Sequence, residues 1–113
     1  MTNIFDLEGA LQRVDGDRSL LCELAVIYLD EVGKLKLALC DALGKNDILA
    51  ASKAAHTLKG ACANFCSPAV YDAAWAFEQL RPSNTAQEIT EAYERLFQAA
   101  ERLNQALREE FAI

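Results

Sequence analysis

A lone histidine and the residues just after it form the part of this chain best suited to chemistry. His56 is the only histidine among 113 residues, and Lys59 and Gly60 follow it three and four positions later. With a reference pKa of about 6.5, an exposed imidazole is largely neutral at neutral pH and can act as a nucleophile. An ammonium one helical turn ahead can stabilise an anionic group that the ring has accepted. This spacing therefore suits attack by the ring on an electrophile that carries negative charge.

Hydrophobic periodicity places His56 on the polar side of a helix. At about 100° per residue, small and apolar side chains gather on one side. They are Ala51, Ala54, Ala55, Leu58, Ala61, Cys62 and Phe65. The opposite side, which we expect to face solvent, holds Ser52, Lys53, His56, Lys59, Gly60, Ala63 and Asn64.

Gly60 needs a reason, because a glycine inside a helix costs about 1 kcal/mol relative to alanine. We interpret it as leaving room for another molecule to approach the imidazole of His56. The plainer alternative is a surface histidine without a chemical role, with Gly60 serving close helix packing.

The segment resembles the signature of histidine-containing phosphotransfer (HPt) domains, the phosphocarriers of multistep phosphorelays. The matching residues are Ala55, His56, Leu58, Lys59, Gly60, Cys62 and Phe65, then Val70, Ala73, Ala74 and Phe77 at spaced apolar positions, then Glu78. The chain departs from the pattern at Cys66, where the family usually has glycine. That departure leaves open how the histidine helix ends.

The resemblance implies a role for each matching polar residue. His56 would accept the phosphoryl group, Lys59 would contact its oxygens, and Gly60 would clear space for docking. Glu78 would hydrogen-bond the inner ring nitrogen and orient the ring, unless it is an ordinary surface carboxylate. Four neighbours would line the surface that meets the partner: Ser52, Lys53, Ala63 and Asn64.

The implied partners are receiver domains of response regulators, a hybrid sensor histidine kinase, or both. Mg²⁺ would come with the receiver, and we expect this chain to bind no cofactor. No G-x-x-x-x-G-K-[ST] loop is present, which predicts a phosphocarrier and not an enzyme that phosphorylates itself from ATP. Two other functions stay open: a docking module that inhibits a receiver or kinase without being phosphorylated, and a helical bundle that carries a metal or haem. The latter needs several inward ligands, and one outward histidine argues against it.

A zinc site at the cysteines is disfavoured by helix geometry. Cys62 and Cys66 lie four residues apart, but Cys62 is about 120° around the helix from His56. The chain has no second histidine, so the ligands do not converge as zinc requires. We expect no metal, and we interpret the cysteines as free thiols that fill small apolar spaces.

Composition bounds the remaining classes. The length indicates one domain over residues 1–113, and the formal net charge of −6 without a basic stripe argues against a nucleic-acid partner. No apolar run is long enough to cross a bilayer and the first residues do not resemble a signal peptide, so a cytoplasmic location away from membranes is expected. Met1 and the lack of a trailing linker favour a free-standing protein. Because no unpaired apolar stripe is evident, we expect a monomer.

The periodicity predicts helices throughout and no strand. A short helix covers about residues 6–14, and four longer ones begin at the caps Asp17, Asp47, Ser67 and Thr85, the last with Glu88 as a capping box. The histidine helix is expected to run to about Phe65. The predicted fold is all-α, an antiparallel four-helix bundle with an additional short N-terminal helix. In the fourth helix we expect Tyr71, Trp75 and Phe77 to be core or partly covered packing residues.

Overall fold

The computed structural model describes residues 4–113, and every element of the described chain is a helix or a helical turn. Its elements are α1 (Leu7–Arg13), α2 (Arg18–Gly44), α3 (Ile48–Cys62), a 3-10 turn η1 (Ala63–Phe65), α4 (Pro68–Glu78) and α5 (Ala86–Phe111). The all-α bundle with a short first helix is thus confirmed. Met1, on which the free-standing interpretation rests, lies outside the described residues.

Helix starts follow the capping chemistry read from the sequence. The carboxylates of Asp6, Asp17 and Asp47 each accept a hydrogen bond of 3.0 Å from the backbone N–H three residues ahead. At α5 the Thr85 hydroxyl accepts from the Glu88 N–H at 3.1 Å, and the Glu88 carboxylate accepts from the Thr85 N–H at 2.8 Å. The predicted caps at Asp17, Asp47 and Thr85 are confirmed, and each satisfies backbone donors that a helix leaves unpaired.

The turn between α3 and α4 differs from the prediction in detail. Ser67 stands at the cap position of α4, but its hydroxyl makes no capping bond and instead donates to the carbonyl of Ile4 at 2.8 Å. Cys66 adopts the left-handed conformation, with φ 51° and ψ 54°, which a glycine would enter without steric cost. The backbone N–H of Asp6 donates to the Cys66 carbonyl at 3.2 Å. This turn therefore anchors the segment that leads into α1.

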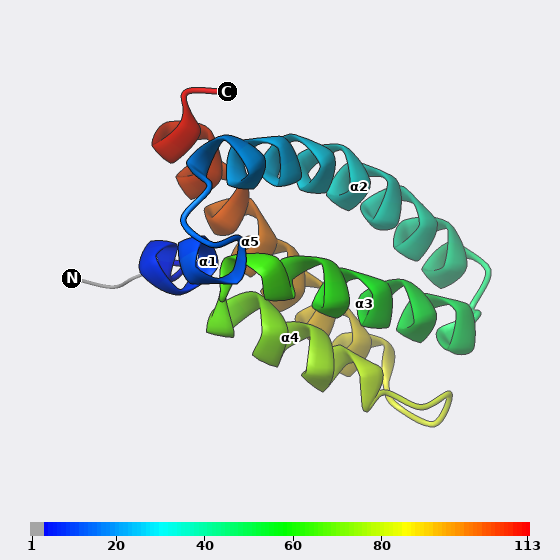
Figure 1. The fold of residues 1–113 in the computed structure, drawn as a ribbon. Coiled ribbons are helices and arrows are strands. Elements are labelled where there is room, and N and C mark those ends of the chain that lie inside the picture. Colours follow the sequence, from blue (N-terminus) through cyan, green and yellow to red (C-terminus); the bar gives the residue numbers. More distant parts are fainter. Residues whose placement is uncertain (1–3) are drawn as a thin grey trace.

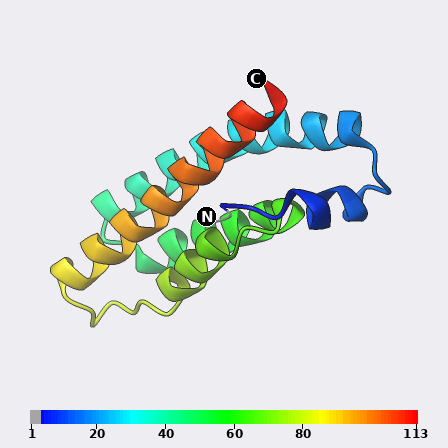
Figure 2. The same ribbon diagram turned by 90° about the vertical axis from the view of Figure 1, so that its left-hand side faces the viewer.

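In the bundle α3 lies between α2 and α4, with which it makes its main contacts (Figure 1). Turned by 90°, the bundle shows α5 running from the end of α4 back toward the start of α2 (Figure 2). There the Arg18 guanidinium donates to both the carboxylate and the carbonyl of Glu110, at 2.8 and 2.7 Å. This pairing joins the first residue of α2 to the end of α5.

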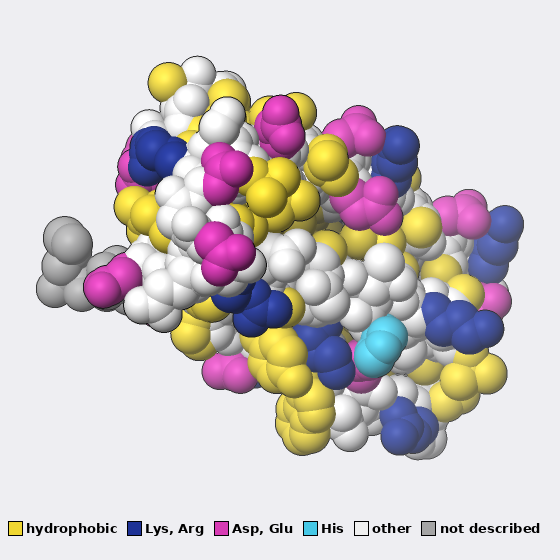
Figure 3. Space-filling model, viewed as in Figure 1, with side chains coloured by type: hydrophobic (Ala, Val, Ile, Leu, Met, Phe, Trp, Pro, Cys, Tyr) yellow, Lys and Arg dark blue, Asp and Glu magenta, His cyan; other side chains and the backbone are white. Residues whose placement is uncertain are grey.

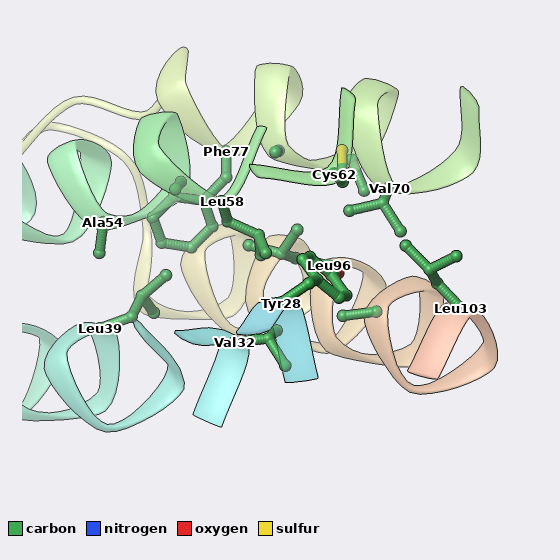
Figure 4. Packing of buried hydrophobic residues seen from close by; sticks show 14 of the residues in the cluster. Tyr28, Val32, Leu39, Ala54, Leu58, Cys62, Val70, Phe77, Leu96 and Leu103 are labelled. Atoms are coloured by element: carbon green, nitrogen blue, oxygen red, sulfur yellow. The ribbon is translucent and has the colours of Figure 1, made fainter. Parts of the chain in front are cut away.

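The core is a seam of alanines, leucines and a few aromatic rings between the helices (Figure 4). Its largest fully buried side chains are Phe65, Phe77, Leu21, Leu39, Leu58, Leu96, Leu103 and Leu107. Leu58 and Cys62 reach this core from α3, so that helix is held by the face opposite to His56. The core thus fixes how α3 presents its polar face.

The apolar surface is more exposed than the sequence analysis suggested in two places. Tyr71 and Trp75 are about half exposed, which is the partly covered state of the prediction, and only Phe77 of the three aromatic residues in α4 belongs to the core. Helix α4 has only one buried face, and Phe77 lies on it. Tyr71 and Trp75 lie on a different side of the helix and therefore point outward. The outer face of α2 also exposes large apolar side chains, namely Leu20, Val26, Ile27 and Leu37. The argument for a monomer from the absence of such residues therefore fails, and the oligomeric state stays a prediction.

Candidate functional site

His56 projects from the outer face of α3, where its side chain is 69% exposed. Its close neighbours in the helix, Ala55 and Leu58, are almost completely buried. A space-filling view shows the imidazole open to solvent, with basic side chains around it (Figure 3). The ring can therefore be reached by another protein without any rearrangement of the bundle.

Glu78, the last residue of α4, brings the second helix to the site. Its Oε1 lies 2.6 Å from Nδ1 of His56, and its Oε2 lies 2.7 Å from Nζ of Lys59. The contact between Glu78 and the inner ring nitrogen is the one that the sequence analysis anticipated. The shared carboxylate was not anticipated: one acid holds both the imidazole and the ammonium.

The charges of this cluster follow from its partners. Partial burial by itself would raise the pKa of the Glu78 carboxyl, but hydrogen bonds from Lys59 and His56 outweigh it and lower that pKa. The hydrogen bond to Glu78 raises the pKa of the Lys59 ammonium. At neutral pH the cluster thus contains a carboxylate and an ammonium, and the carboxylate can only accept a hydrogen bond from Nδ1–H. The neutral ring therefore carries its hydrogen on Nδ1 and its lone pair on Nε2.

Lys59 is less exposed than its position on the polar face of α3 suggested. Its side chain is only 16% exposed. The ammonium lies 5.5 Å from the centre of the Tyr71 ring, within the range of a cation–π contact. The lysine is therefore held between an acid and an aromatic ring, and is not a free surface cation.

The other predicted site residues lie around the ring at different depths. Gly60 is exposed, and a Cβ built on it would meet no atom within 4 Å. Lys53 and Asn64 are exposed, whereas Ser52 and Ala63 are half-buried. Because nothing in the bundle packs against Gly60, the alternative that this glycine serves close helix packing is excluded.

A shallow hollow of about 590 Å³ opens beside the imidazole. It is lined by Leu49, Ser52, Lys53, His56, Thr57 and Glu78. Sequence reasoning missed Leu49 here and missed Tyr71 beside Lys59. A signal for the aromatic side existed, because Tyr71, Trp75 and Glu78 are spaced by four and three and so share one face of α4.

The cysteines are free thiols in the described chain. Cys62 is buried, and its thiol donates to the carbonyl of Lys59 at 3.2 Å. Burial raises its pKa to about 11. Among residues 4–113 no group of three or more side chains is placed to hold a metal ion.

An exposed histidine whose ring is held by an acid, on a bundle of four antiparallel helices, is the arrangement that the resemblance to HPt domains led us to expect. The family model for the Hpt domain matches residues 23–110, most of the chain. This protein therefore belongs to the Hpt domain family, whose members are phosphocarriers that work with receiver domains and kinases.

Comparison with curated proteins and with solved structures returned no match. Within the described residues, no helix combines the length and the apolar character needed to span a membrane.

Proposed function

We propose that this protein is a histidine phosphocarrier of a multistep phosphorelay, with His56 as its phosphoacceptor. It takes the phosphoryl group from an aspartyl phosphate on a receiver domain, or from a kinase, and passes it to the receiver of a response regulator. The observation that carries the proposal is the 2.6 Å contact between Nδ1 of His56 and the Glu78 carboxylate, on a ring that is 69% exposed. That contact leaves Nε2 as the nucleophile on the accessible side.

The transfer step follows from this tautomer. The lone pair of Nε2 attacks phosphorus, the N–P bond forms, and the bond between phosphorus and the aspartyl oxygen breaks, with the electron pair leaving on the aspartate carboxylate. The ring keeps its hydrogen on Nδ1 and becomes cationic. Glu78 stabilises this developing charge, because a charge-assisted hydrogen bond is stronger than a neutral one.

Lys59 changes partner in this scheme. Before transfer its ammonium balances Glu78 at 2.7 Å. After transfer the cationic ring can balance Glu78 instead, which releases the ammonium to the phosphoryl oxygens. The imidazole and the ammonium thus share one carboxylate before the reaction, and after it the cationic ring balances Glu78 while Lys59 balances the phosphoryl group.

The surrounding surface serves docking. Gly60 leaves open space next to the ring, and Ser52, Lys53, Ala63 and Asn64 extend the area that a receiver covers. The receiver supplies the acidic pocket and Mg²⁺, and this chain supplies the nucleophile and its setting. Phosphoryl transfer of this kind depends mostly on positioning and electrostatics. We further propose that this chain acts as a phosphocarrier without autokinase activity and that it is located in the cytoplasm.

The test is transfer from a receiver, followed by intact mass. The protein is mixed with a receiver domain, Mg²⁺ and acetyl phosphate, beside a His56→Gln control. We expect one acid-labile phosphoryl group on the wild type and none on the variant. If no receiver from the source organism labels the wild type, the carrier function is wrong and the unphosphorylated docking module replaces it.

A further inference from the structure

Three large apolar side chains are exposed around His56, although most others of their kind in the described chain are buried or partly buried. Leu49 on α3 is 71% exposed, and Tyr71 and Trp75 on α4 are 46% and 53% exposed. Hydrophobic side chains lie on both sides of the histidine (Figure 3). Exposed aromatic rings next to a functional group mark a surface that is covered when a partner binds.

Contacts tie Leu49 and Tyr71 to the site, and helical spacing ties Trp75 to it. Leu49 lines the same hollow as His56. The Tyr71 ring lies against the Lys59 ammonium, and Trp75 follows Tyr71 by one turn and precedes Glu78 by one turn. The two aromatic residues therefore continue the face of α4 that carries Glu78.

The size of a protein interface places all three inside the area that a docked receiver covers. A typical specific interface buries about 800 Å² on each partner, which corresponds to a disc of roughly 16 Å radius. Leu49 is seven residues, or about 10 Å of helix axis, from His56. Trp75 is about 5 Å along α4 from Glu78, which contacts the ring. A partner centred on His56 thus covers these side chains.

The two helices offer this partner different chemistry. Helix α3 carries Lys53 and Lys59 and no acidic residue, although the whole chain has a formal net charge of −6. Helix α4 offers the aromatic pair. The acidic pocket of a receiver fits against Lys53 and, once the cationic ring balances Glu78, against Lys59. A second copy of this chain does not, because it would bring the same lysines and the same ring against themselves.

We propose that Trp75 and Tyr71 form the apolar anchor by which this protein recognises its receiver, with Leu49 as a second contact across the ring. The receiver surface that meets α4 is then apolar and lies beside the phosphoryl pocket. This inference rests on the proposed function. It assigns recognition to α4 and chemistry to His56, so the two can fail separately.

Trp75 is the only tryptophan of the chain and reports on its own environment. The probe is a receiver domain that phosphorylates His56, with its own tryptophans replaced by phenylalanine. Saturating unphosphorylated receiver should shift the Trp75 emission to the blue and reduce its quenching by acrylamide severalfold. Unchanged emission and quenching with a receiver that does transfer would overturn the anchor while leaving the carrier function intact. A blue shift that grows with protein concentration without receiver would also overturn it, in favour of self-association.

Variants separate docking from chemistry. Trp75→Ala should weaken receiver binding about tenfold or more, as expected for a central aromatic contact, whereas Trp75→Phe should recover most of the affinity. Ile27→Ala, which removes a similarly exposed apolar side chain from α2, is the matched control and should bind as the wild type. Phosphoramidate, a small donor that needs no docking, checks that His56 stays reactive in Trp75→Ala. Equal receiver affinity of Trp75→Ala and wild type would contradict the proposal.

Discussion

The two faces of α3 belong to one helix but meet different requirements. On the inner face Ala51, Ala55 and Leu58 are at most 1% exposed, and small or branched apolar side chains are what this close packing accepts. On the outer face His56 is largely exposed and Gly60 has open space above it. Substitutions on the inner face should therefore change stability, and those on the outer face should change transfer.

Glu78 and Lys59 lie between these extremes, each with a side chain about one sixth exposed. They join α3 to α4 and also set the charge around the ring. Because Glu78 contributes both to helix packing and to the charge around the ring, a change at Glu78 should affect both stability and transfer.

Leu58→Ala gives the largest effect expected for stability. Loss of a fully buried leucine costs about 2–5 kcal/mol, since a cavity replaces well-packed atoms. Urea denaturation followed by circular dichroism measures it. His56 in the remaining folded fraction should still be phosphorylated by a receiver. A loss of stability below about 1 kcal/mol would contradict the prediction that the inner face of α3 determines stability.

Glu78→Gln should slow transfer to His56 roughly tenfold, because a neutral amide loses the stronger, charge-assisted hydrogen bond to Nδ1. Single-turnover transfer from a phosphorylated receiver measures the rate. Glu78→Asp, which retains the charge on a shorter side chain, is the control that separates the effect of the charge from the effect of side-chain length. Equal rates for Glu78→Gln and wild type would show that the charge of Glu78 has no part in transfer.

The same variant should change how stability depends on pH. Since the folded protein lowers the pKa of Glu78, its contribution is present above the ordinary value of 4.5 and is lost as pH falls through the lowered pKa. The raised pKa of Lys59 means that its contribution is present below 10.5 and lost at higher pH. The difference in unfolding free energy between wild type and Glu78→Gln should thus be largest near neutral pH and shrink in acid. A constant difference from pH 3 to pH 7 would refute this.

Gly60→Gln tests the outer face alone. A side chain there enters open space, so the fold should be kept and even stabilised by up to about 1 kcal/mol through helix propensity. Transfer from a receiver should nevertheless slow by roughly fivefold to tenfold, equivalent to about 1 kcal/mol of lost docking. Gly60→Ala is the smaller control and should slow transfer less. Unchanged transfer by Gly60→Gln would show that Gly60 is not needed to leave room for docking.

Cys66→Gly should give the smallest effect. A residue with a Cβ costs about 1–2 kcal/mol in the left-handed conformation, and glycine removes this strain. The extra conformational freedom of glycine in the unfolded chain offsets about 0.4–1 kcal/mol of the stabilisation. A net stabilisation of about 0.5 kcal/mol is expected in urea denaturation, with Cys66→Ala as the control that keeps the strain. Equal stability of the glycine and alanine variants would show that the turn is not strained.

Much of this protein was determined by its sequence alone. Local chemistry explains why: Asp17, Asp47 and Thr85 cap helices through bonds to their own neighbours, and periodicity places His56 opposite Leu58 whatever the rest of the chain does. The motif around His56 also pointed to the Hpt family before any fold was known.

The contacts between side chains of different helices depend on how the helices pack. Glu78 contacts His56 and Lys59 across 22 and 19 positions of sequence, and which carboxylate oxygen meets which partner depends on how α4 packs against α3. The outward turn of Tyr71 and Trp75 has the same origin, because α3 and α5 already cover the other side of α4. Side-chain position within one helix follows from its period, whereas contacts between helices follow from packing that no local pattern contains.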